Sequence, residues 1–411
     1  MVMSLPEELE EKVREALGYA DRYNLVNFSK RNIMLLDTTL REGEQNPKVS
    51  FTTRQRLQIS WMLDYFGVDF IEISPIITKE HEEACKKMIK AGLGANIIAH
   101  LRALKSDVDV ALRCGASWIA MYHSISDLHL EYKLRISREQ AKNRIIDAVE
   151  YAKSHGLKLR FSMEDASRAE PNFLIEICKA VKEAGADRIS LPDTVGVLTP
   201  KGMYNLVNMV IKNVRIPVDV HCHNDLGLAL ANSLAGFEAG ASQIHTSING
   251  IGERTGIASL AEVVSALIIL YKVRLDVRIE MLKELSELIE QYTGIKVPES
   301  KPIIGDNAYR HKAGTHVAAV IRNPQAYELM PPKLVGNRRR LVFGELSGKN
   351  GAAFLMKILG LEPNGEDAER LAKGLKKLRK GDLFELDLTE DLERKVLRVE
   401  DGIGGDRFEL S

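Results

Sequence analysis

Eight short apolar segments, each followed by a stretch with helical periodicity, span residues 33–272 of the chain. We expect β-strands at residues 33–37, 70–73, 97–101, 118–122, 157–163, 188–191, 218–221 and 244–248. Glycines such as Gly67, Gly92 and Gly156 follow several of the helical stretches, as is typical of helix ends. Repeated strand-then-helix units indicate a parallel sheet, and eight of them favour an α/β fold of the closed (β/α)8 TIM-barrel type. A doubly wound open sheet is the alternative.

The helices between these strands are predicted at residues 53–66, 138–154, 173–183, 200–213 and 228–238. In the first of them, Leu57, Trp61 and Tyr65 recur every four residues and therefore share one helical face. We assign residues 31–275 to the barrel, 276–351 to a linker subdomain with short helices, and 352–398 to a small helical subdomain. The region after the barrel is thus predicted to be mainly helical, and residues 399–411 to be poorly ordered.

The charge balance narrows the possible partners. Lys plus Arg and Asp plus Glu both number 57, so there is no broad electrostatic argument for binding nucleic acid or a membrane surface. No apolar run approaches the ~20 residues that cross a bilayer, and the first residues lack an apolar signal core. The four cysteines are scattered and form no Cys-x-x-Cys pair, which argues against a disulfide framework or a zinc–thiolate site. We therefore expect a cytoplasmic protein.

Two predicted strand ends carry residues suited to metal binding. His221 and His223 stand two positions apart on the seventh strand, so both imidazoles point to the same side and can bind one cation, whereas Cys222 points to the other. Two histidines and one carboxylate would leave coordination positions open for substrate and water. The first strand ends in Asp37–Gln45, where an arginine and a carboxylate can face the barrel mouth. A pair of core histidines and a charged surface loop are the structural alternatives.

Other polar residues fall at the same end of the predicted barrel. Arg160, Ser162 and Glu164 alternate onto one face of the fifth strand, a combination that suggests recognition of a carboxylate, although charged residues that pair with one another would give the same pattern. Thr194 ends the sixth strand, and His100 lies alone on the third, where a core histidine is the simpler interpretation. After the eighth strand, the glycine-rich loop 249–256 permits close backbone approach to an anion or cofactor.

Taken together, three of these segments resemble a known family. Asp37–Gln45, His221–Asp225 and Gly250–Gly256 are similar to the acetyl-CoA-condensing, metal-dependent TIM-barrel synthases: the homocitrate, isopropylmalate and citramalate synthases. The resemblance extends from about residue 33 to residue 361. Glu42 and Ile257 make it look nearest to the homocitrate synthases of lysine biosynthesis, since isopropylmalate synthases usually have Asp and Asn there. Thr38 departs from this pattern, because homocitrate synthases often have Ser at that position.

The resemblance implies roles for individual residues at the metal and the 2-oxo acid. The implied ligands of a divalent metal are Glu42, His221 and His223. The metal would be Mg²⁺ or Mn²⁺, with Co²⁺ and Zn²⁺ also suited to such a shell. Arg41 would face the keto oxygen, with Gln45 beside it. The residues implied to hold substrate carboxylates are Arg160, Ser162 and Thr194.

The resemblance also implies residues for proton transfer and for acetyl-CoA. Glu164, His316 and Tyr327 match positions of acid–base chemistry; an ordinary helix tyrosine is the alternative for Tyr327. The acetyl-CoA-side loop would comprise Gly250, Gly252, Glu253 and Arg254. We expect His100 to select the acceptor, since isopropylmalate synthases tend to have an apolar residue there, whereas a charged or donating imidazole could pair with a second carboxylate.

The resemblance, together with these residues, implies an enzyme that condenses acetyl-CoA with 2-oxoglutarate to give homocitrate and CoA. The alternatives are a 2-isopropylmalate synthase, an enzyme with both activities, a citrate synthase of this barrel type, a citramalate synthase, and a related metal-dependent aldolase or lyase. A metal-binding scaffold without turnover is the non-enzyme alternative. The resemblance further implies a homodimer. Because the large C-terminal regulatory domain of many isopropylmalate synthases is not seen, we expect no feedback control through such a domain.

Overall fold

The computed structural model of the chain describes residues 7–24, 28, 30–377 and 384–388. Eight parallel strands close a barrel in chain order, because β1 pairs with both β2 and β8. The strands are β1 Met34–Asp37, β2 Phe70–Ile73, β3 Asn96–Arg102, β4 Trp118–Ser124, β5 Lys158–Glu164, β6 Arg188–Asp193, β7 Val218–Cys222 and β8 Gln243–Thr246. The predicted TIM barrel is therefore confirmed, and the doubly wound sheet is excluded.

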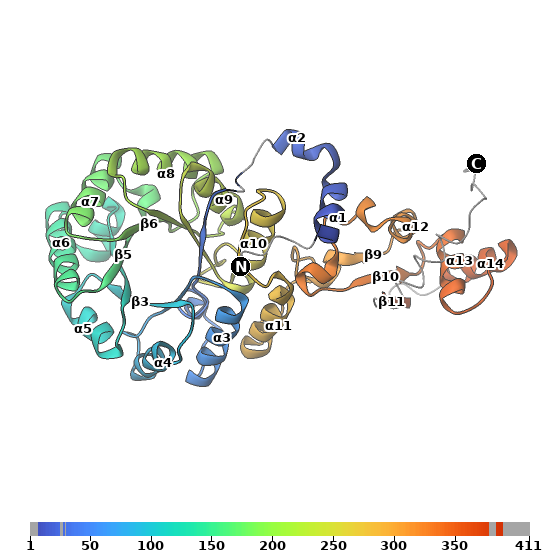
Figure 1. Cartoon of the computed structure of the whole chain (residues 1–411), viewed down its shortest axis with the longest axis horizontal. Coiled ribbons are helices and arrows are strands. Elements are labelled where there is room, and N and C mark those ends of the chain that lie inside the picture. Colours follow the sequence, from blue (N-terminus) through green and yellow to red (C-terminus); the bar gives the residue numbers. More distant parts are fainter. Residues whose placement is uncertain (1–6, 25–27, 29, 378–383, 389–411) are drawn as a thin grey trace. The chain divides into compact units, whose positions relative to one another are not determined.

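Helices surround this barrel in a ring (Figure 1). They are α3 Thr53–Phe66, α4 Lys79–Lys90, α5 Lys105–Cys114, α6 Arg138–Ser154, α7 Pro171–Glu183, α8 Pro200–Val214, α9 Ala229–Ala239 and α10 Leu260–Ile269, followed by α11 Leu282–Thr293. Local sequence explains their starts: Thr52 before α3 and Ser137 before α6 each form a capping box with a glutamine three residues on. Among the described residues, no helix is both long and apolar enough to span a bilayer.

The face of α3 that packs on the barrel is not the one that carries Trp61 and Tyr65. Trp61 and Tyr65 are 54% and 57% exposed, whereas Ile59, Leu63 and Phe66 are fully buried. Both sets follow helical spacing, and the set of Ile59, Leu63 and Phe66 is the one that faces the strands. Leu57, Trp61 and Tyr65 thus share a face as predicted, but it is the outer face.

The interior of the barrel has an apolar layer and, beside it, a layer of polar residues. Near the start of the strands, Leu36, Phe70, Ile98 and Ala120 form an apolar layer contributed by β1–β4. Two residues farther along the same strands the inward positions become polar, since side chains at i and i+2 point to the same side of a strand. These inward polar positions therefore lie toward the C-terminal ends of the strands, the end at which barrel enzymes carry their chemistry.

The described residues fall into two compact units. One contains residues 28–296 and hence the barrel; the other contains residues 297–388 together with residues 7–24. The helices of the second unit are α1 Glu7–Leu17, α2 Asp21–Asn24, α12 Gly314–Arg322, α13 Lys349–Ile358 and α14 Gly365–Leu375. Its sheet has the order β11-β10-β9, formed by Phe384–Leu388, Arg339–Phe343 and Arg310–His311.

A small core of its own holds the second unit together. Val317 and Val320 of α12 pack with Leu341 and Phe343 of β10 and with Phe354 of α13. The helical character predicted for this region is confirmed, and the three-stranded sheet is an addition to it. The predicted divisions at residues 275 and 351 stay predictions, and residues 399–411 lie outside the described residues.

Candidate metal centre and active site

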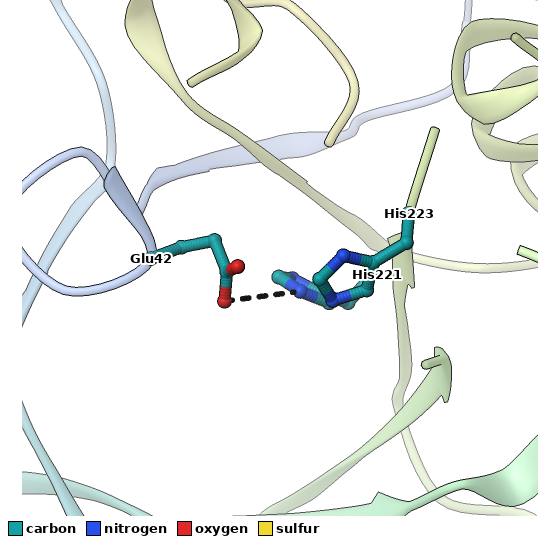
Figure 2. Close-up of side chains that lie close together, drawn as sticks. All are labelled: Glu42, His221 and His223. Carbon is teal, nitrogen blue, oxygen red and sulfur yellow. Dashed lines mark ion pairs between the residues drawn. The ribbon is translucent and has the colours of Figure 1, made fainter. Parts of the chain in front are cut away.

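Three buried side chains converge at the C-terminal end of the barrel. Glu42 belongs to the turn after β1, His221 lies on β7, and His223 follows β7. Each can offer one ligand atom, and these atoms all lie within 4.8 Å of one another. His221 Nε2 is 3.8 Å from Glu42 Oε2, and Figure 2 shows the carboxylate and the two rings directed toward one another. The geometry therefore brings together the three residues predicted as metal ligands.

The electrostatics of this group suit a cation. Burial, together with the charges of His223 and Arg41, holds the pKa of His221 well below its usual range, and burial also lowers the pKa of His223. Both imidazoles are therefore neutral at neutral pH, the form that ligates metals. Neither Nδ1 has a hydrogen-bond partner among the described residues. A donor set of two nitrogens and one carboxylate oxygen fits a divalent cation.

An ion-pair network lies beside Glu42, His221 and His223, which we call the metal group. Arg41 pairs with Glu42, and its Nε donates to Glu72 Oε1 at 2.5 Å. The other oxygen of Glu72 accepts from Arg160 Nη2 at 2.5 Å. Burial alone would raise the pKa of Glu72, but the charges of Arg41 and Arg160 hold it well below its usual range. Glu72 is thus an ionised, fully buried carboxylate that fixes two arginines at the barrel mouth.

Glu72 and His245 are the members of this network that the sequence analysis missed. His245 on β8 lies 3.1 Å from Arg160 Nη1 through its Nε2, and burial lowers its pKa to about 4. A signal was available for Glu72, which is the lone polar residue of the apolar strand β2. For His245 the signal was weaker, because Gln243 and Thr246 of the same strand are also polar. Arg160 was predicted to bind a substrate carboxylate, and in the structure its guanidinium is engaged by Glu72 and His245.

His100 lies on the same inward layer as Glu72. Its ring stacks on that of Tyr122, with 4.8 Å between centroids and an interplanar angle of 9°. Burial and the charge of Arg41 lower the pKa of His100 to about 3. Of the two roles expected for this imidazole, the cationic one is therefore disfavoured at neutral pH, and donation of a hydrogen bond is the role left open.

Three other predicted residues lie in the barrel unit. Gln45 Oε1 accepts a hydrogen bond from Arg41 at 3.4 Å, so it stands beside the metal group as expected. Ser162 is buried on β5. The hydroxyl oxygen of Thr194 accepts a bond from the backbone N–H of Asp165 at 2.9 Å. Thr194 thus joins the ends of β5 and β6.

The glycine-rich loop packs directly on the metal group. A Cβ at Gly252 would lie 3.0 Å from the Glu42 side chain, so a larger residue would have to displace that carboxylate. The backbone N–H of Glu253 donates to Glu42 Oε1 at 2.9 Å. Arg254 pairs with Asp225 at 2.7 Å. The loop predicted for the acetyl-CoA side therefore orients a metal-ligand candidate through its own backbone.

The predicted acid–base residues fall in different units. Glu164 ends β5, and its carboxylate contacts Lys133 at 2.6 and 2.7 Å and Ser124 at 2.5 Å. His316 and Tyr327 belong to the second unit, where their rings stack with 4.0 Å between centroids. The remaining predicted residues all belong to the barrel unit, and the second unit brings His316 and Tyr327 to each other.

Comparisons with known proteins identify the family of the chain. Residues 32–289 match the HMGL-like family model, and residues 303–382 match the homocitrate synthase post-HMGL domain-like model. A probable 2-isopropylmalate synthase of Ignicoccus hospitalis is 46% identical over 89% of this chain and 92% of its own length. The homocitrate synthase AksA of Methanopyrus kandleri is 45% identical over 84% of this chain and 87% of its own.

Solved structures show the same fold at lower identity. The HMG-CoA lyase of Bacillus subtilis matches 65% of this chain and 96% of its own with a TM-score of 0.59 and 21% identity. A citramalate synthase of Methanocaldococcus jannaschii is a further sequence relative, 42% identical over 85% of this chain and 71% of its own. The chain belongs to the HMGL-like family, within the group that contains the 2-isopropylmalate, homocitrate and citramalate synthases. It is an enzyme of this synthase group, of the acyltransferase type.

Proposed function

We propose that the protein condenses acetyl-CoA with a 2-oxo acid in a metal-dependent, Claisen-type reaction. The observation that carries this proposal is the buried group of Glu42, His221 and His223 with Arg41 against it, at the C-terminal end of a barrel of this family. The names of the relatives support it, since each is a synthase of this reaction type. Mg²⁺ or Mn²⁺ is the proposed metal, with Co²⁺ and Zn²⁺ as alternatives.

The geometry divides the chemical work among the residues of the chain. When bound, the cation would polarise the keto group of the 2-oxo acid as a Lewis acid. Arg41 is held between Glu42 and Glu72, so it presents its remaining N–H groups to the negative charge that develops on that oxygen. Glu164 is a carboxylate at the same end of the barrel and would take the proton from the methyl group of acetyl-CoA.

His316 and Tyr327 would serve the acid–base steps from the second unit. Hydrolysis of the thioester then releases CoA and makes the condensation irreversible. We also propose that the enzyme is a homodimer and that it acts in the cytoplasm.

As acceptor we propose 2-oxoglutarate, which gives homocitrate. Its distal carboxylate needs hydrogen-bond donors. Since Arg160 is already engaged by Glu72, we assign this role to His100 and Ser162. The neutral His100 would donate one N–H rather than carry a charge. The post-HMGL domain match also points to homocitrate synthases.

A 2-isopropylmalate synthase is the second candidate, alone or as one activity of a promiscuous enzyme. The specific observation in its favour is that relatives 46% identical to this chain carry that name. The further alternatives are oxaloacetate as acceptor, giving citrate, pyruvate as acceptor, giving citramalate, and a related aldolase or lyase reaction.

The test is kcat/KM for CoA release, followed with a thiol reagent, for 2-oxoglutarate, 2-oxoisovalerate, pyruvate and oxaloacetate. Wild type should favour 2-oxoglutarate. His100→Leu should lower its preference over 2-oxoisovalerate by ~2–4 kcal/mol in transition-state binding. The control is His123→Leu, which alters the histidine next to Tyr122 on the other face of β4. Wild-type preference for 2-oxoisovalerate, or a ratio unmoved by His100→Leu, would contradict the acceptor assignment.

A further inference from the structure

The segment after β4 is fastened to the end of β5. It contains the π-helical turn η3, His129–Leu134, which ends where Arg135 adopts a left-handed φ of 55°. The backbone N–H of Ile125 donates to the carbonyl of Glu164 at 3.1 Å. Ser126 Oγ donates to Asp165 Oδ2 at 2.5 Å. These bonds fix the segment to the two residues that end and follow β5.

The π-helical turn places one cation on the Glu164 carboxylate. Lys133 Nζ lies 2.6 and 2.7 Å from the two oxygens of Glu164 and 3.3 Å from Ser124 Oγ. Ser124 in turn donates to Glu164 Oε2 at 2.5 Å. The carboxylate therefore receives donors from the π-helical turn and from β4, and together they fix its orientation.

Burial and connectivity separate this contact from an ordinary surface ion pair. The Lys133 side chain is 46% exposed, and pairs at such exposure contribute little on their own. Glu164 is only 21% exposed, however, and Ser124, the third member, is 2% exposed. Rare π-helical turns often occur at functional sites, because they redirect a side chain that a regular helix would not present.

The Glu164 carboxylate also shares its surroundings with the metal group. Ser124 and Tyr122 stand two residues apart on β4, and Tyr122 stacks on His100. Glu164, Ser162 and Arg160 alternate onto one side of β5. Arg160 and Arg41 both pair with Glu72, and Arg41 also pairs with Glu42. The inward row of β5 therefore connects the metal group with Lys133.

We propose that Lys133 is a positioning residue that holds the Glu164 carboxylate toward the barrel mouth, in place to accept a proton from carbon. This inference rests on the proposed function and deepens it. In the step that it serves, a C–H bond of the acetyl-CoA methyl group breaks, the proton passes to a Glu164 oxygen, and the electron pair remains as the enolate. Lys133 keeps its protons throughout and acts only through Glu164.

The experiment compares Lys133→Ala and Lys133→Arg with a matched control. Lys142→Ala removes a lysine that pairs with Glu176 at 2.6 Å between α6 and α7. In Lys133→Ala we expect kcat to fall about 10–100-fold while KM for the 2-oxo acid changes less than about three-fold. Lys133→Arg should recover most of kcat, and Lys142→Ala should retain wild-type values.

Two further measurements separate positioning from a general structural effect. Ethylammonium added to Lys133→Ala should restore part of kcat, and tetramethylammonium at equal ionic strength should not, because it has no N–H to donate. In a double-mutant cycle, Lys133→Ala should cost little more once Glu164 is already Gln. Wild-type kcat in Lys133→Ala, a rise in KM alone, equal rescue by both cations, or additive losses in the cycle would each overturn the proposal.

Failure of the underlying function would look different. If wild type releases no CoA with any of the four 2-oxo acids, the proposed reaction is wrong whatever the variants do. The four proteins of the double-mutant cycle are wild type, Lys133→Ala, Glu164→Gln and the double variant. Their melting temperatures then test the contact between Lys133 and Glu164 without turnover. Non-additive shifts in melting temperature would support Lys133 as the residue that fixes Glu164. Additive shifts would overturn this contact as well.

Discussion

At the scale of single residues, the candidate site depends on groups kept neutral or ionised by their surroundings. The histidines at the metal group are neutral because burial and neighbouring positive charge disfavour their protonated forms. Glu72, equally buried, stays ionised because two guanidiniums contact it. Burial disfavours the charged form of all three groups, and only at Glu72 do paired charges outweigh it.

The candidate metal ligands give the first residue-scale prediction. The double variant His221→Ala/His223→Ala should lose bound divalent metal and most activity, because Glu42 alone would leave a cation under-coordinated. Metal content is measured by elemental analysis after dialysis against the metal, beside activity. The control is His155→Ala at the exposed C-terminal end of α6. Full metal content in the double variant would refute the site.

Asp37 gives a pH prediction. This carboxyl is fully buried at the end of β1; one oxygen accepts from the Thr39 N–H at 2.8 Å, and the other has no partner among the described residues. Burial raises its pKa to about 7. Between about pH 4 and pH 7 the unfolded chain therefore loses a proton that the folded chain keeps, so stability falls as pH rises through this window.

Asp37→Asn should remove that dependence. We expect the unfolding free energy of wild type, measured relative to the variant in metal-free protein, to decline by at most about 4 kcal/mol between pH 4 and pH 7 and then to level off. Urea unfolding at a series of pH values measures it. The slope of this difference with pH is the test, since the effect of the amide itself does not depend on pH. A difference that does not change with pH would show that Asp37 is ionised throughout.

At the scale of elements, helix ends show where local sequence suffices and where packing intervenes. Gly67 after α3 and Gly92 after α4 both have positive φ, 107° and 70°, as expected of glycines at helix ends. Their surroundings differ. A Cβ at Gly67 would lie 2.4 Å from the backbone oxygen of Asp276, whereas nothing lies within 4 Å of one at Gly92.

The two glycines therefore form a matched pair for mutation. Gly92→Ala should cost about 1 kcal/mol in unfolding free energy, the penalty of a left-handed alanine. Gly67→Ala should cost about 2–3 kcal/mol or more, because the backbone of the loop at Asp276 must also move. Urea unfolding of both variants measures the difference. Equal costs would mean that this loop yields without penalty.

At the scale of the whole molecule, the proposed acid–base residues are distributed over two compact units with separate cores. His316 and Tyr327 stack on each other in the second unit, and Tyr327 is 50% exposed. The metal group lies wholly in the barrel unit. If the second unit contributes to the chemistry, altering it should change turnover and leave metal binding intact.

His316→Ala and Tyr327→Phe test this division. Each should keep full metal content and lower kcat by about 100-fold or more, the usual contribution of a general acid or base. Tyr65→Phe is the control, since Tyr65 is similarly exposed on the outer face of α3. A rise in KM with unchanged kcat would make the two residues part of substrate binding, and loss of metal would place them in support of the metal group.

The sequence by itself determined the barrel and most of its candidate residues. Local periodicity produced the strands and helices, and i, i+2 spacing placed His221 beside His223, because backbone geometry alone controls both. Only the tertiary structure decided which face of α3 is buried and which charges pair. Glu72 with Arg41 and Arg160, and Lys133 with Glu164, join different strands and loops. Barrel closure and strand register set those distances, and they are global properties that no local stretch of sequence encodes.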